Sequence, residues 1–237
     1  MLIGRILGAG FVVLASFALA PAADVPEKLL KEIEKTKSDY EEGCKAADKK
    51  LLEAFDAEKE LIRKQAGLKA EARQKALEAI DVEKDTFEKQ GTIPLSLRMR
   101  TAAMNYVKAN RKVARPTEVA YDKAIEFLQK AKDDSAAAEL IAQKKKVLSQ
   151  KVAVSLLVTT PDNKSSWTTI LFMDGTSNHP SLKWTLEKDK LVHVNTGAGA
   201  PAGGWVDTCL FEIDGQRGQA KNQKGSVLNL KRIDPPK

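Results

Sequence analysis

The apolar residues of this chain change their spacing near Lys151, and that change limits the folds open to it. Before it, apolar residues recur at alternating steps of three and four, which is typical of a helix with one buried stripe. After it, they alternate with polar residues at a period of two, which is typical of a half-buried strand. The sequence therefore predicts an α+β protein, with a helical region over 24–150 and a small antiparallel β barrel or sandwich over 151–237.

The helical region begins with two runs at heptad spacing, over 30–62 and 70–87. Gly67 lies between them, so an antiparallel hairpin of coiled-coil-like helices is expected. One continuous helix is the alternative, because a single glycine costs only about 1 kcal/mol within a helix. Gly91 is placed to end the second helix.

Three shorter helices are expected in the rest of this region. The first covers about 95–115 and is interrupted by Pro116, because proline lacks the backbone N–H that a helix interior needs. Thr117 is a suitable N-cap for the next helix, and the residues 133–135 mark the start of the last.

The C-terminal region reads as about seven short strands separated by turn residues. Trp184 shares one strand face with Leu182 and Leu186, so its ring is expected in the core. The glycine-rich segment 197–204 lacks the helix start and Lys-Ser/Thr pair of a phosphate loop, and Trp205 opens a strand directly after it. A mobile loop between strands that borders a binding face is expected here.

The first 23 residues follow the order of a secretory signal peptide. Arg5 gives a positive start, an apolar run covers 6–20, and small residues at Ala22 and Ala23 suit cleavage. The run is shorter than the roughly 20 apolar residues of a spanning helix. The mature chain is therefore expected to be secreted or periplasmic, with no transmembrane segment after cleavage.

The two cysteines, Cys44 and Cys209, are far apart in the sequence. An oxidising compartment would permit one long-range disulfide between them. Each cysteine also falls on the apolar stripe of its own element, so two buried thiols are the favoured interpretation.

The net charge of +7 is spread over both regions, so nucleic acid is not expected as a partner. One stretch, 97–116, contains cations and no acid. Its basic residues are Arg98, Arg100, Lys108, Arg111, Lys112 and Arg115. They form a candidate site for envelope polysaccharide, lipid head groups or an acidic protein; the alternative is a solvated helix face paired with neighbouring acids.

The β region has a recognisable order of turn residues and tryptophans. The motifs are Asp174-Gly175-Thr176, Trp184-x-Leu186, Leu191, Trp205-x-Asp207, Asp214-Gly215, Gly218, Asn222 and Gly225. This order resembles the small lipocalin-like or partial-barrel modules at the ends of uncharacterised secreted bacterial proteins, and the helical half resembles the hairpins that precede them. The resemblance covers about the last 85 residues. It implies a fold and a compartment, and carries over no activity or catalytic residue.

No catalytic set, cofactor motif or metal-binding motif is found in the sequence. His179 and His193 have no nucleophile near them in sequence, so both are expected to be structural or solvated. No H-E-x-x-H, C-x-x-C or calcium-loop pattern occurs. Asp174 and Asp214 each precede a turn glycine, which accounts for both.

Trp205, Asp207 and Trp167 are the candidate ligand-binding residues. Asp207 shares a strand face with Trp205, and a carboxylate among apolar neighbours must be paired, hydrogen-bonded or at the mouth of a cleft. A non-catalytic envelope binding protein is the favoured function, with the helices as a spacer or a surface for homo-oligomers. The alternatives are a carbohydrate hydrolase using Asp207 and a second acid, and a purely structural coiled-coil protein.

Overall fold

The computed structural model describes residues 25–148, 151–188 and 190–235. It confirms the α+β class, with four helices followed by seven strands in the described chain. The expected leader, residues 1–23, lies outside the described residues. The helices are α1 (Glu27–Lys64), α2 (Ala70–Gln90), α3 (Arg100–Lys130) and α4 (Asp134–Val147).

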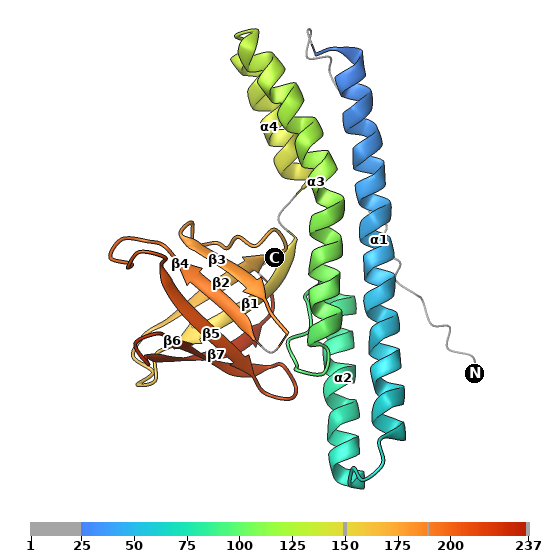
Figure 1. Ribbon diagram of the computed structural model, residues 1–237, viewed down its shortest axis with the longest axis vertical. Coiled ribbons are helices and arrows are strands. Elements are labelled where there is room, and N and C mark those ends of the chain that lie inside the picture. The colour runs from blue at the N-terminus through green and yellow to red at the C-terminus, as the bar shows by residue number, and fades with distance from the viewer. Residues whose placement is uncertain (1–24, 149–150, 189, 236–237) are drawn as a thin grey trace, which may run out of the picture.

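The first two helices are separate elements that lie side by side in Figure 1. Gly67, in the connection between them, has a φ of +82°, a conformation that suits glycine. Gly91 ends α2 at φ +69°, and its N–H donates to the carbonyl of Phe87 at 2.7 Å. The alternative of one continuous helix is therefore wrong.

The third helix runs through Pro116, which corrects the expected break. The segment from Thr117 to Lys130 is the second half of α3 and not a new helix. Packing of α3 against α1 holds the helix at this position: Thr117 is fully buried, and its hydroxyl donates to the carbonyl of Thr36 in α1 at 2.8 Å. The last expected start is confirmed, since the Asp133 side chain accepts a hydrogen bond from the N–H of Ala136 at 3.0 Å.

The strands form one antiparallel sheet that curls into a nearly closed barrel (Figure 1). They are β1 (Val152–Thr159), β2 (Ser166–Phe172), β3 (Leu182–Leu186), β4 (Leu191–Asn195), β5 (Trp205–Phe211), β6 (Arg217–Asn222) and β7 (Val227–Ile233). Their order is β2-β1-β7-β6-β5-β4-β3, so β1 pairs with the last strand and the edges are β2 and β3. The segment between these edges bridges them, because Leu171 pairs with Ser177 and the N–H of Trp184 donates to Gly175 at 2.9 Å.

The helices and the barrel share one hydrophobic core. Phe55, Phe87 and Tyr106 from the helices belong to the same buried cluster as Leu156 and Trp184 from the strands. Trp184 is 1% exposed, as expected, and its indole N–H donates to the carbonyl of Phe172 at 2.8 Å. A second cluster joins α1, α3 and α4 further from the barrel.

The segment between α2 and α3, residues 91–99, closes the inner end of the barrel. Ile93 and Leu95 in this segment are fully buried within the shared core. The N–H of Ile93 donates to the carbonyl of Ala153 in β1 at 2.8 Å, which ties the segment to the sheet. We call residues 91–99 the plug.

Glu83 of α2 is the buried carboxylate that holds the plug in place. Its Oε1 atom accepts hydrogen bonds from the N–H groups of Leu95 at 2.5 Å and Ser96 at 2.9 Å. Its Oε2 atom accepts a third bond from the Ser96 hydroxyl at 2.5 Å. Burial raises the pKa of Glu83, while the three hydrogen bonds and Arg232 oppose that rise. Gly215 leaves room for this network, since a Cβ there would lie 2.3 Å from Oε1 of Glu83.

We expect Glu83→Ala to lower the free energy of unfolding by about 3 kcal/mol, because it leaves two buried N–H groups without an acceptor. Glu83→Gln keeps one acceptor oxygen and should cost less than Glu83→Ala, though it removes the charge near Arg232. Urea denaturation of the three proteins measures this order. Equal losses in the two variants would contradict the assigned role.

We expect Pro116→Ala to raise the free energy of unfolding by about 1–3 kcal/mol, because it restores a backbone donor inside α3. Pro116 is exposed, so the substitution leaves the core unchanged. Chemical denaturation of the variant against the wild type provides the measurement. A less stable variant would show that the proline is needed for the path of α3.

Candidate functional site at the barrel mouth

The outer end of the barrel is open and contains a cavity of about 580 Å³. Inward positions of the strands line it, because alternate residues of a strand point to the same face. The described lining residues are Val158, Trp167, Thr169, His179, Ser181, Leu182, His193, Asn195, Trp205, Asp207, Ala220, Asn222, Lys224, Ser226, Leu228 and Leu230. Five of these residues are aliphatic, and most of the aromatic and polar groups come from strand ends and loops. We call this space the mouth cavity.

The structure brings the three candidate ligand residues together in the mouth cavity. Trp167 comes from β2, whereas Trp205 and Asp207 come from β5, which is separated from β2 by three strands in the sheet. Trp167 is 38% exposed and Trp205 is partly buried, so both rings can be reached from solvent. The Lys224 ammonium lies 4.5 Å from the centroid of the Trp205 ring, a cation–π contact at the rim.

His193 lies opposite Asp207 in the register of β4 and β5. It is 5% exposed, and its Nε2 atom has no hydrogen-bond partner among the described residues. Its Nδ1 atom is 3.8 Å from the sulfur of Cys209, two residues along the same face of β5. The mouth cavity therefore contains a buried polar atom that the described protein groups leave unsatisfied.

The titratable groups around His193 are shifted toward their neutral forms. Burial lowers the pKa of His193 to about 4, so the imidazole is neutral at physiological pH. Burial raises the pKa of Asp207, and burial with the nearby Asp207 raises the pKa of the Cys209 thiol. Cys209 is therefore a protonated thiol and a poor nucleophile, which argues against a Cys-His catalytic pair.

The closeness of His193 and Cys209 was missed by the sequence reasoning. The alternation of side chains along the two strands could have revealed this contact. Leu191, His193 and Asn195 share one face of their strand, and Asp207 and Cys209 share one face of the next strand. Two consecutive antiparallel strands place such faces together. Separation along the sequence concealed the contact, because nine residues connect the two strands.

Local contacts define the ends of the glycine-rich loop beside the mouth cavity. Asn195 accepts the N–H of Gly197 at 2.9 Å at the start of the glycine-rich loop. Gly204 ends that loop at φ +83°, where a Cβ would lie 2.8 Å from the carbonyl oxygen of Asn195. His179, from the segment that bridges β2 and β3, also lines the cavity, and its Nε2 atom has no partner in the described chain.

Asp174 and Asp214 serve in turns, as the sequence indicates. Asp174 accepts from the N–H of Thr176 at 2.8 Å, and Asp214 accepts from the N–H of Gln216 at 2.9 Å. Neither lines the mouth cavity, so Asp207 is the sole carboxylate in its described lining. Among the described residues no group of three His, Cys, Asp or Glu side chains is placed to hold a metal ion.

The six cations of 97–116 have different environments. Arg100 is 2% exposed and donates to the carbonyl of Leu95 at 2.6 Å. Arg111 donates to the carbonyl of Met173 at 2.7 Å, and its guanidinium lies 5.4 Å from the centroid of the Trp184 ring.

The other four cations lie nearer the surface. Arg98 pairs with Glu58 at 3.0 Å, and Arg115 pairs with Glu118 at 2.9 Å. Lys108 and Lys112 are exposed on α3 and take part in no ion pair among the described residues. Three of the six cations, Arg98, Arg100 and Arg111, thus contact the plug, the barrel or α1.

Both thiols are free. Cys209 is buried, as expected, whereas Cys44 of α1 is only partly buried. The sulfur of Cys44 lies 3.4 Å from Oδ1 of Asn110 in α3, so the two cysteines belong to different parts of the structure. The favoured interpretation of two buried thiols is therefore confirmed for Cys209, whereas Cys44 is free but only partly buried.

Comparisons with protein-family models, with curated proteins and with solved structures found no match to this chain. No helix in the described ranges combines the length and the apolar character needed to cross a bilayer. The case for a function therefore depends on the geometry of the mouth cavity.

We expect the stability of the protein to fall as the pH drops from about 6.5 to about 4 because of His193. The imidazole has an ordinary pKa of about 6.5 in the unfolded chain and about 4 in the folded one, so the unfolded state binds more protons in this window. The loss is about 3 kcal/mol, and it is complete below the folded pKa.

Chemical denaturation of the wild type and of His193→Gln at pH 7 and pH 4 measures this contribution. Asp207 and Glu83 titrate in both proteins, so they contribute to both curves and the difference isolates His193. The wild type should lose about 3 kcal/mol more than the variant. Parallel losses would mean that the folded imidazole takes up a proton at its ordinary pKa.

Proposed function

We propose that the protein is a non-catalytic binding protein whose mouth cavity holds a small ligand. The observation that carries this proposal is the buried Nε2 atom of His193, which faces an open cavity and has no partner in the described chain. An unsatisfied buried polar group costs free energy, and a ligand group that pairs with it recovers that cost. The two accessible tryptophan rings at the rim support the same conclusion.

The lining indicates the kind of ligand. A flat apolar group would contact the rings of Trp167 and Trp205, which offer large surfaces with little loss of side-chain entropy. The protonated thiol of Cys209 faces Nδ1 of His193, an arrangement that leaves the imidazole proton on Nε2. The ligand would then present a hydrogen-bond acceptor to Nε2 and, near the rim, a group that suits Lys224.

The location and the role of the helices are part of the proposal. The signal-like order of residues 1–23 supports a secreted or periplasmic protein. The short connection between α1 and α2 supports an antiparallel, coiled-coil-like hairpin that serves as a spacer or as a surface for homo-oligomers. The resemblance to lipocalin-like modules of secreted proteins agrees with this assignment.

A carbohydrate hydrolase is the less favoured function. Glycoside hydrolysis requires two carboxyl groups facing one cleft about 5–10 Å apart. The described lining of the mouth cavity provides Asp207 and no second acid. Asp207 lies opposite His193 in the register of β4 and β5, without a second carboxyl group to act with it in that lining.

Fluorescence titration with 1-anilinonaphthalene-8-sulfonate tests the mouth cavity, because this probe combines a flat apolar ring system with an anionic group. We expect the wild type to bind it and Trp205→Ala to bind it at least tenfold more weakly, a loss of about 1.4 kcal/mol. Trp167→Ala and His193→Gln should also weaken binding.

Ile213→Ala is the matched control, because Ile213 is 63% exposed and lies outside the mouth cavity. It should bind the probe like the wild type. Equal affinity in Trp205→Ala, Trp167→Ala and the wild type would overturn the proposed site, as would a failure of the wild type to bind.

A further inference from the structure

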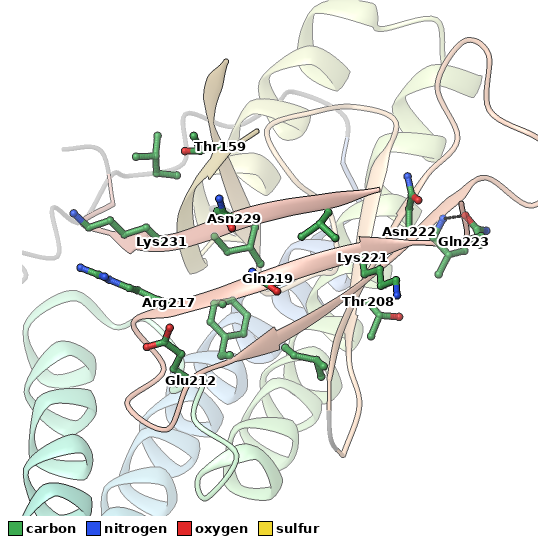
Figure 2. Close-up of a pocket in the computed structure, with 17 residues that line it drawn as sticks. Thr159, Thr208, Glu212, Arg217, Gln219, Lys221, Asn222, Gln223, Asn229 and Lys231 are labelled. Carbon is green, nitrogen blue, oxygen red and sulfur yellow. Dashed lines mark hydrogen bonds between the residues drawn. The ribbon is translucent and has the colours of Figure 1, made fainter. Parts of the chain in front are cut away.

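The outer face of β5, β6 and β7 has a groove that is separate from the mouth cavity. Its volume is about 900 Å³, and it reaches onto β1 (Figure 2). The two spaces lie on opposite faces of the same strands, because Val206, Thr208 and Leu210 alternate with the inward residues of β5. We call this space the outer groove.

The outer groove carries an excess of unpaired positive charge. Arg217, Lys221 and Lys231 line it, with Glu212 as the sole acid of the described lining. None of the three cations takes part in an ion pair within 4.0 Å among the described residues, although many other lysines and arginines of this chain do. Figure 2 shows Arg217 and Lys231 extending from neighbouring strands in the same direction.

Arg217 and Lys231 are direct cross-strand partners in the register of β6 and β7. Like charges in this position destabilise a sheet. Glu212 and Asp214 line a neighbouring hollow with Arg217 and Lys231, but among the described residues neither acid forms an ion pair with them within 4.0 Å. Lys231 is also opposite Leu157 of β1, an apolar residue that offers no compensating charge. An anion that binds between the two side chains would relieve the repulsion between them.

Aliphatic side chains occupy the groove beside these cations. The outward residues Leu157, Val206, Leu210 and Val227 line it, and Leu210 is 56% exposed. Their contact with water is a cost that a bound apolar surface would remove. The combination of an aliphatic floor and cations at both ends defines the chemistry of the occupant.

We propose that the outer groove is a docking surface for an acidic, amphipathic segment of a partner protein. Arg217 and Lys221 are four residues apart on β6, which corresponds to about 13 Å along a strand. Carboxylates two helical turns apart, about 11 Å, would approach both ends of the groove. The apolar side of the same segment would cover Leu210 and its aliphatic neighbours, in the helix-in-groove mode of recognition.

An anionic polysaccharide fits the outer groove less well. Sugar rings are held best by exposed aromatic faces, and the single aromatic residue in the described lining is Phe211. Phe211 is partly buried and packs against the shared core, so its ring is only partly available to a sugar. The aliphatic floor therefore favours a protein segment.

The test uses the full chain and a fluorescein-labelled 15-residue Leu/Glu amphipathic peptide, with binding followed by anisotropy. R217E/K231E should weaken binding at least tenfold, and L210S should weaken it several-fold without changing its salt dependence.

K183E/K188E is the control: it makes the same change in net charge at two exposed lysines outside the groove and should leave affinity within twofold. A peptide with Gln in place of Glu should bind at least tenfold more weakly.

Stability separates a binding role from a structural one. R217Q removes the like-charge pair without adding an acid beside Glu212 and Asp214, so its melting temperature should equal or exceed that of the wild type while its peptide affinity falls. Equal loss of affinity in R217E/K231E and K183E/K188E would overturn the proposal, as would absence of binding to the wild type. The proposal would also be overturned, in favour of a polysaccharide, if a polyuronate bound more tightly than the peptide and L210S left the polyuronate affinity unchanged. Because Trp205→Ala leaves this face unchanged, failure here is distinguishable from failure of the mouth cavity.

Discussion

The packing of the plug into the inner end of the barrel is the interaction on which the rest of the structure depends. Ile93 and Leu95 complete a core that neither the helices nor the strands could form alone. Three hydrogen bonds to the buried carboxylate of Glu83 fix the backbone of this segment. With one end closed in this way, the opposite end of the barrel is the open one, and its polar groups lie where the core stops.

The sequence was sufficient for the fold class and for most element boundaries, and the three candidate residues it singled out lie together in the mouth cavity. Periodicity identifies such features because burial acts on every turn of a helix and every second residue of a strand. The same reasoning failed at Pro116, where the local preference of proline was outweighed by packing of α3 against α1. It also gave no sign that Glu83, in a charged helix, would be fully buried.

The remaining features depend on contacts between residues that are distant in the sequence. His193 and Cys209 become neighbours through strand register, and Arg217 faces Lys231 for the same reason. The cations of 97–116 look alike in the sequence, yet Arg100 is buried while Lys112 is exposed. Composition can predict that charges are present, but only the path of the chain decides which of them meet solvent, the core or each other.

The shared core has a consequence for how the protein can change over time. Domains that fold independently can be exchanged between genes, because each brings its own buried surface. In this protein the strands do not enclose a complete core by themselves, and Leu156 and Trp184 would be exposed to water without the helices. The barrel and the helices must therefore be inherited together, whereas the rim residues can vary without disturbing the packing between the two halves.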